Sequence, residues 1–191
     1  DYYAEQAILS MLSAKYRMPE ITISLLMDQS TKDNLDGFRK KVLELSDDQI
    51  VIQLDNQSSF IKSRILKTKM RSLVNGDFLY VDVDTIWADS INESDFTSDV
   101  MGVLDANCEL KNHALKGYVK NCFERLNYIP TYPNHINGGV LYMKDSAAAL
   151  QFSKEWNRLW ENCCQRGIKF DQPSLHQTID AFRMEFQELP G

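Results

Sequence analysis

Two carboxylates separated by a single residue, Asp82 and Asp84, directly follow a run of apolar residues at positions 78–81. Ligands of doubly wound sheets bind at the carboxyl ends of strands, which is where this order places the pair. Alternate side chains of an extended strand point the same way, so both carboxylates would reach one cation. Their oxygens suit Mg²⁺ or Mn²⁺ and leave coordination positions for diphosphate oxygens. We therefore predict a metal site at Asp82 and Asp84, against the alternative of solvated or helix-capping carboxylates in a turn.

A cluster of basic residues lies just upstream, on a predicted helix. Arg64, Lys67 and Arg71 share one face of that helix by their three- and four-residue spacing. The guanidinium of Arg64 suits a carboxylate or phosphate partner, which makes Arg64 a candidate ligand for an anionic substrate. The alternative for any single member is a solvated basic stripe, whose members are Lys62, Arg64, Lys67, Lys69 and Arg71.

Two further segments combine polar side chains with unusual backbone positions. The glycines at 138 and 139 enter a predicted strand, where paired glycines mark a bulge or a tight turn, or let the backbone approach a ligand closely. Asn137 beside them has an amide donor and a carbonyl acceptor for sugar hydroxyls. Asp171 and Gln172 open a predicted helix with a proline in its first turn, which favours helix capping by Asp171. The same two side chains are alternatively placed to face a reacting sugar carbon.

Hydrophobic periodicity predicts the elements that must position these residues. We expect helices over 3–16, 35–45, 59–74 and 146–166, and a short helix after 171. Strands are expected over 21–27, 50–54, 78–83, 139–143 and 184–189. Alternating helices and strands predict an α/β fold with a mostly parallel sheet covered by helices on both faces, in one domain over residues 1–191. Between 89 and 134 we expect a polar stretch, a short apolar run at 100–104 and irregular sequence, and loops of this length usually carry function.

Composition narrows the classes of function. The net charge of -6 argues against general nucleic-acid binding, which depends on many lysines and arginines. The four cysteines lack the two-residue gap of zinc and redox motifs, so we expect reduced thiols and a cytoplasmic protein. No apolar stretch approaches the roughly 20 residues of a membrane span, and no signal peptide opens the sequence. At this length a compact fold needs no structural metal, so a bound metal would serve chemistry.

Taken in order and spacing, these features resemble the GT-A glycosyltransferases, especially family 8 and related bacterial nucleotide-diphospho-sugar transferases. The resemblance runs from the start of the sequence to Asp171-Gln172 and implies a GT-A, Rossmann-like fold. It also implies that a first strand and a C-terminal segment lie outside this sequence at its two ends. By the resemblance, Asp82-Val83-Asp84 would bind Mn²⁺ or Mg²⁺ and the nucleotide diphosphate. The other residues that it implicates contact the donor, the transferred sugar or the acceptor, and these are Arg64, Lys67, Asn137, Gly138, Gly139, Asp171 and Gln172.

The activity implied by the resemblance is transfer of a hexose from a nucleotide diphosphate sugar, with uridine diphosphate hexose as the leading donor, to a saccharide or other hydroxyl acceptor. Family 8 enzymes retain anomeric configuration, and Gln172 would lie near the reacting carbon. An inverting enzyme needs a carboxylate base, for which Asp171 is the nearest candidate. A third metal ligand, often histidine, comes from a later segment in the family, and His113, His135 and His176 all precede that position. No nucleic-acid partner is expected, and peripheral contact with a membrane is left open.

Two other readings compete with a glycosyltransferase. A phosphatase of the haloacid dehalogenase class also places Asp-x-Asp after an apolar strand, with Asp82 as nucleophile and Asp84 as acid and base. That motif normally opens its domain, whereas here it follows two helix and strand units. A non-catalytic domain that binds a sugar nucleotide or a partner would keep the fold without the activity.

Overall fold

The computed structural model describes residues 2–112 and 116–189, and leaves the side chains at 106, 107 and 116 undescribed. His113 therefore lies outside the described residues. By internal contacts the chain divides into unit 1, Asp1–Leu66 with Val81–Glu93, and unit 2, Lys67–Tyr80 with Ser94–Gly191. The division falls within helix α4 (Ser59–Lys69) and within strand β3 (Phe78–Val81). Each unit is described by itself.

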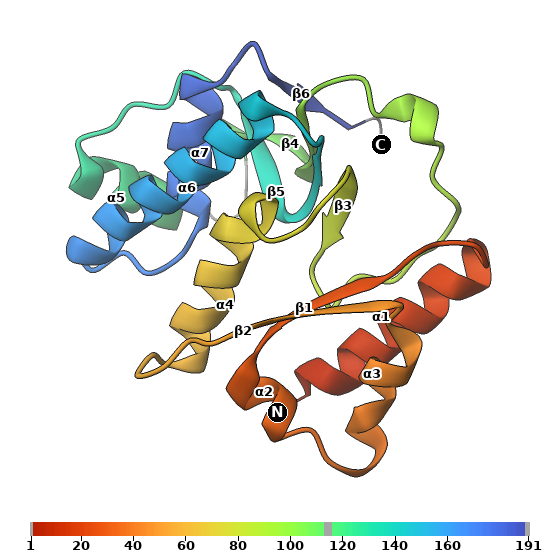
Figure 1. Cartoon of the computed structure of the whole chain (residues 1–191). Coiled ribbons are helices and arrows are strands. Elements are labelled where there is room, and N and C mark those ends of the chain that lie inside the picture. The colour runs from red at the N-terminus through yellow and green to blue at the C-terminus, as the bar shows by residue number, and fades with distance from the viewer. Residues whose placement is uncertain (1, 113–115, 190–191) are drawn as a thin grey trace. The chain divides into compact units, whose positions relative to one another are not determined.

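Unit 1 is built around a two-stranded parallel sheet (Figure 1). Strand β1 (Ser24–Asp28) pairs with β2 (Asp48–Ile52), so that Asp28 and Ile52 end the two strands at one edge. The helices of this unit are α1 (Tyr3–Arg17), α2 (Gln29–Asp33), the 3-10 turn η1 (Gly37–Lys40), α3 (Lys41–Leu45) and most of α4.

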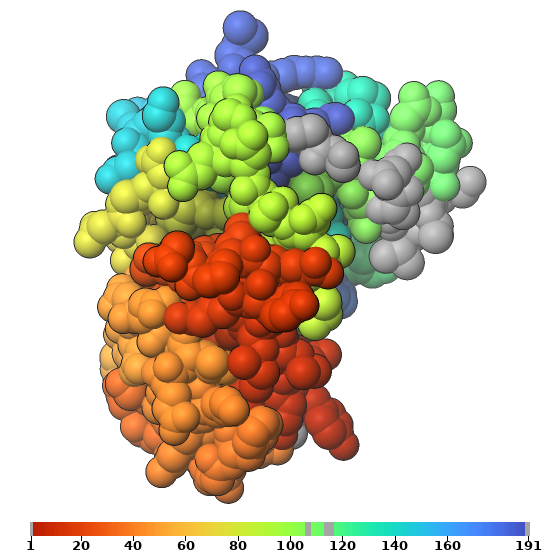
Figure 2. Space-filling model, turned by 90° about the vertical axis from the view of Figure 1, so that its right-hand side faces the viewer, coloured from red at the N-terminus to blue at the C-terminus, as the bar shows by residue number. Residues whose placement is uncertain are grey.

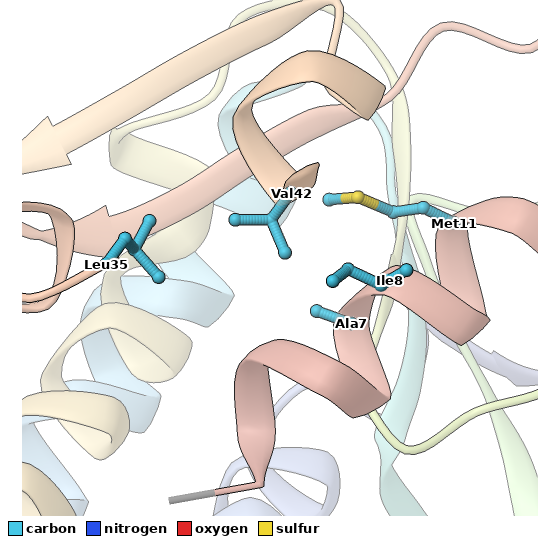
Figure 3. Packing of buried hydrophobic residues seen from close by; sticks show 5 residues of the cluster. All are labelled: Ala7, Ile8, Met11, Leu35 and Val42. Atoms are coloured by element: carbon cyan, nitrogen blue, oxygen red, sulfur yellow. The ribbon is translucent and has the colours of Figure 1, made fainter. Parts of the chain in front are cut away.

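One face of α1 supplies the core of unit 1. Ala7, Ile8 and Met11 recur at helical spacing and pack with Leu35 and Val42, as Figure 3 shows. The opposite side of α1 keeps large apolar side chains exposed, and the space-filling view of Figure 2 shows this first segment, in red, at the surface. Val83, the residue between the two predicted metal ligands, packs against the same core cluster.

Unit 2 contains a four-stranded sheet with the order β3-β5-β4-β6. Strands β4 (Val100–Glu109) and β5 (Asn134–Met143) are antiparallel, whereas β4 and β6 (Phe186–Glu188) are parallel. The α/β class is confirmed, but the expected mostly parallel sheet is wrong here, because the sheet is mixed. We had expected only a short apolar run at 100–104, yet the chain stays extended to Glu109 and forms the strand that pairs with both neighbours.

Helices of unit 2 pack against this sheet. Helix α6 (Ala147–Gln165) lies beside α7 (Gln172–Ala181), and α7 contacts β5 (Figure 1). Phe152 and Trp156 of α6, Leu175 of α7 and Leu141 of β5 are fully buried. The remaining helical elements are η2 (Met70–Ser72), η3 (Glu93–Asp95), η4 (Leu110–Asn112) and α5 (Lys116–Leu126).

Predicted and observed boundaries agree best for helices with clear periodicity or an N-cap residue. The predictions for 3–16 and 146–166 are confirmed as α1 and α6, and the Ser146 hydroxyl caps α6 by accepting a hydrogen bond from the Ala149 amide at 3.1 Å. The predicted helix 35–45 is split into η1 and α3, and the irregular region before residue 134 contains α5. Strand β3 ends at Val81, two residues before the predicted end.

Candidate functional site

A buried ion pair in unit 2 joins two of the predicted site residues. The Lys67 ammonium lies 3.5 Å from an Asp171 carboxylate oxygen, with side chains only 7% and 8% exposed. The same ammonium lies over the ring of Tyr80, 5.4 Å from its centroid. Removing charges from water is costly unless they are paired with good geometry, so the two side chains hold each other in place.

The backbone of Asp171 is held at the start of α7 by three donors. Its carbonyl oxygen accepts hydrogen bonds from the Leu175 amide at 3.0 Å, the Ser174 hydroxyl at 2.6 Å and the Trp156 indole at 3.3 Å. Asp171 occupies the N-cap position of α7, but its side chain makes no capping hydrogen bond. The capping alternative is therefore wrong for this carboxylate, which faces Lys67 instead.

Gln172 links α7 to the backbone of β5. Its amide nitrogen donates to the carbonyl of Ile136, and its amide oxygen lies against Gly138. A Cβ at Gly138 would come within 3.4 Å of that oxygen and 3.6 Å of an Asp171 carboxylate oxygen. The absence of a side chain at 138 thus leaves the strand backbone, the carboxylate and the amide next to one another.

The paired glycines lie in a bulge of β5. On β4, Gly102 and Val103 are consecutive, whereas their partners on β5 are Leu141 and Asn137. Residues 138–140 are therefore extra on β5, and this shift in register lies where the glycines predict a bulge. The side-chain oxygen Oδ1 of Asn137 accepts a hydrogen bond of 2.7 Å from the Gly139 amide and stabilises the bulge, so this side chain is partly engaged by the neighbouring backbone.

In unit 1, the two aspartates of the predicted metal site lie in a turn. The Thr85 amide donates to the Asp82 carbonyl at 3.0 Å, which closes a turn over 82–85. The expectation that an extended strand points both carboxylates the same way is wrong, because the strand has ended at Val81. Asp84 is exposed and Asp82 is half-buried.

The chemistry of these two side chains fits a hard divalent cation, since carboxylate oxygens are the donors that Mg²⁺ and Mn²⁺ prefer. The exposure of Asp84 also fits a metal site, because its carboxylate is open to a ligand from solution. Within the described residues no group of three or more His, Cys, Asp or Glu side chains is arranged to hold a metal ion.

Most of the basic cluster serves the structure. The buried Arg71 donates to the carbonyls of Gly76 and Met143 at 2.6 and 3.3 Å, and Lys62 lies 2.8 Å from the buried carboxylate of Asp28. Lys67 is engaged by Asp171, so the solvated stripe is wrong for these three residues. Arg64 stacks on the ring of Phe60 at 4.6 Å and donates to the Ser63 hydroxyl at 3.0 Å, whereas Lys69 is exposed.

Sequence reasoning missed a pair of buried histidines in unit 2. Nδ1 of His135 lies 2.7 Å from Nε2 of His176, and the side chains are 2% and 0% exposed. Nε2 of His135 lies 3.7 Å from a carboxylate oxygen of Asp105 on β4. In the sequence, His135 stands two residues before Asn137. A further signal is the four-residue spacing of Gln172 and His176, which places both on one side of α7.

The predicted residues are divided between the two units. Unit 2 brings together Lys67, Gly138, Asp171 and Gln172, with Asn137 and Gly139 in the same bulge, whereas Arg64 and Asp82-Val83-Asp84 belong to unit 1. All four cysteines are free, as predicted.

Within residues 2–112 and 116–189, none of the helices combines the length and apolar character needed to cross a membrane. Comparison of the chain with models of protein families found no match, and comparison with curated proteins found none either.

Proposed function

We propose that this protein is a metal-dependent glycosyltransferase that moves a hexose from a nucleotide diphosphate sugar to a hydroxyl of a saccharide or other acceptor. One observation carries the proposal: Lys67, Gly138, Asp171 and Gln172, singled out from distant parts of the sequence, meet at the first turn of α7. A GT-A type of fold is part of the same proposal, and the α/β architecture of the chain is compatible with it.

The residues at the start of α7 have the chemistry to bind a sugar. A carboxylate and a carboxamide oxygen accept hydrogen bonds from sugar hydroxyls, and a glycine beside them keeps the strand backbone close to both. Transfer breaks the bond from the anomeric carbon to a diphosphate oxygen, forms a bond to the acceptor oxygen and releases the acceptor proton. We assign Asp171 and Gln172 to the transferred hexose, with retention of configuration, and keep Asp171 as the base for an inverting reaction.

Asp82 and Asp84 are assigned to the cation and the donor diphosphate, with Arg64 as a further contact to the donor. When bound, Mn²⁺ or Mg²⁺ would neutralise charge that develops on the leaving diphosphate. The side chain of Val83 packs into the core of unit 1 and so anchors the turn between the two carboxylates. The turn therefore presents its aspartates from a fixed backbone.

A thermal-shift screen of nucleotide sugars tests this proposal. A ligand that binds only the folded state raises the melting temperature by linkage, so uridine or guanosine diphosphate hexose should raise it only with Mn²⁺ or Mg²⁺ present. Asp84→Ala should abolish the shift without loss of stability, because Asp84 is exposed. The matched control is Asp89→Ala, which removes another exposed carboxylate of unit 1 and should leave the shift unchanged.

A shift that survives Asp84→Ala undiminished would remove the metal assignment. Release of nucleoside diphosphate in the presence of acceptor then separates an enzyme from a binding domain, because a binding domain shows the shift without release. Metal-dependent release of phosphate from an aryl phosphate, abolished by Asp82→Asn, would instead support a phosphatase.

A further inference from the structure

The buried histidine pair connects the two elements that carry the proposed sugar site. His135 belongs to β5 and lies two residues before Asn137, whereas His176 belongs to α7 and lies four residues after Gln172. Their ring planes are inclined by only 16°, their centroids are 4.9 Å apart, and the nitrogens that face each other are 2.7 Å apart. This distance is that of a short N–H···N hydrogen bond.

The position of Asp105 favours one arrangement of the protons. Nε2 of His135 lies 3.7 Å from the Asp105 carboxylate, and a negative charge favours a protonated nitrogen at that place. With the His135 proton on Nε2, its Nδ1 would accept the proton that His176 carries on Nε2. The hydrogen bond would then run in one direction, from His176 to His135.

Neighbouring groups hold His176 from the other sides. The ring of Phe123 packs edge-on against the His176 ring at 5.5 Å. The Tyr128 hydroxyl lies 3.2 Å from the His176 carbonyl, but it has a single proton, and the Asp180 carboxylate is the closer acceptor. Burial and this carboxylate raise the pKa of Tyr128, so the hydroxyl keeps its proton. The imidazole of His176 is thus packed between His135 and Phe123.

A hydrogen-bonded pair of buried side chains restricts the relative position of α7 and β5 more than apolar side chains would. Apolar neighbours tolerate small displacements, whereas a hydrogen bond between two buried rings restricts both distance and angle. Together with the hydrogen bond from Gln172 to Ile136, the pair joins α7 to β5 at two consecutive residues that directly precede the bulge. Displacement of a catalytic group by about 1 Å can reduce turnover on the order of 100-fold.

We infer that His135 and His176 are positioning residues: their hydrogen bond fixes the first turn of α7, with Asp171 and Gln172, against the bulge of β5. The inference rests on the proposed function, because the position of Asp171 and Gln172 matters for turnover only if they serve sugar transfer. Neither histidine is assigned a contact with substrate.

The first measurement needs no activity. In the full chain with ¹⁵N-labelled histidine, NMR should detect a scalar coupling across the hydrogen bond between Nδ1 of His135 and Nε2 of His176. The nitrogen shifts should report a bare Nδ1 in His135 and a protonated Nε2 in His176. Absence of the coupling in the wild-type protein overturns the inference.

Two variants of His176 then distinguish a role of its hydrogen bond from a role of its ring in packing. His176→Phe keeps a ring of similar size beside Phe123 but has no donor, whereas His176→Gln supplies an amide N–H near the place of Nε2. We expect His176→Phe to lower kcat by roughly 10- to 100-fold with KM for the nucleotide sugar nearly unchanged. His176→Gln should restore most of kcat. Equal kcat in His176→Phe and the wild type overturns the inference, and so does failure of His176→Gln to recover any activity while it retains the fold.

Failure of the proposed function has a different signature. If the wild-type protein transfers no sugar, the backbone amide signals of Asp171 and Gln172 decide the positioning claim. We expect them to move in His176→Phe and to return toward wild-type values in His176→Gln. Unmoved signals in His176→Phe would overturn the inference independently of any activity. If His176→Phe does not fold, His135→Asn, which keeps an acceptor near the place of Nδ1, should retain the positions of these signals.

Discussion

Lys67 and Asp171 are the two charged residues of the predicted site that the fold buries. Counted with its backbone, each residue is 6% exposed. A buried pair of this kind is a weak source of stability, since its Coulombic attraction is offset by the loss of hydration. Removing one partner is costly, however, because the other charge stays buried.

A double-mutant cycle on Lys67→Met and Asp171→Asn measures the asymmetry. Each single variant should lower the free energy of unfolding by about 3–5 kcal/mol, and the double variant should recover much of the combined loss. Under the proposed function, all three variants lose sugar transfer. Chemical denaturation measures the stabilities, and losses that add to within about 0.5 kcal/mol would show that the two residues do not interact.

At the scale of elements, the pairing of β4 with β5 positions the bulge that carries Asn137 and the two glycines. Gly102 on β4 stands opposite Leu141, directly where the register changes. A Cβ there would lie 2.8 Å from a methyl group of Ile136 and 2.9 Å from one of Leu141, both fully buried. The side chains of Ile136 and Leu141 fill the space beside Gly102, so a side chain at this position is sterically excluded unless they move.

Gly102→Ala should therefore lower the free energy of unfolding by about 1–3 kcal/mol, because neither neighbour can move without disturbing the core. Gly138→Ala is the matched control: its nearest contacts, with Gln172 and Leu175 side chains, would be at an ordinary 3.4 Å, so its cost should be much smaller. Denaturant titrations compare the two. Equal losses would mean that β4 and β5 are not as close at Gly102 as the structure shows.

Across the whole molecule, carboxylates with lowered pKa values occur in both units. Burial alone would raise the pKa of Asp28 in unit 1, but hydrogen bonds from Lys62, Ser30 and Thr31 outweigh it and lower that pKa. In unit 2, burial likewise opposes the hydrogen bonds from Thr131, Tyr128 and Tyr132 that lower the pKa of Asp180.

Such groups make stability depend on acid pH with a definite sign. An aspartate titrates near 3.9 in an unfolded chain, so a lower folded pKa stabilises the protein fully above that pH. This contribution is lost as pH falls below about 4 toward the folded pKa. We expect the free energy of unfolding to decrease over that range.

Asp28→Asn should be less stable than the wild type at neutral pH, and the difference should shrink as pH falls below about 4. Melting temperatures measured between neutral and acid pH check this. Asp89→Asn, at an exposed position, is the control and should follow the wild type closely. A gap between Asp28→Asn and the wild type that is constant over the whole range would contradict the assigned role of Asp28.

The sequence by itself determined the elements that depend on local signals. Apolar residues at helical spacing predicted α1, and Ser146 with the periodic run that follows predicted α6. The apolar run at 78–81 predicted β3, and the glycine pair predicted a bulge. The α/β class followed from the alternation of these elements. In each case the deciding physics lies within a few residues: helix capping, side-chain periodicity or backbone freedom.

Only the tertiary structure decided which distant residues meet. The antiparallel pairing of β4 with β5 makes the sheet mixed, and strand pairing depends on partners that no local pattern specifies. The carboxylate of Asp171 pairs with Lys67 and does not cap its own helix, and His135 pairs with His176. Burial makes an unpaired polar group costly, and in both cases the partner belongs to another element. The chain turns at 82–85 instead of continuing as a strand, and Val83 packs against the core of unit 1. This contact is between distant residues, so the apolar pattern at 78–83 does not predict it.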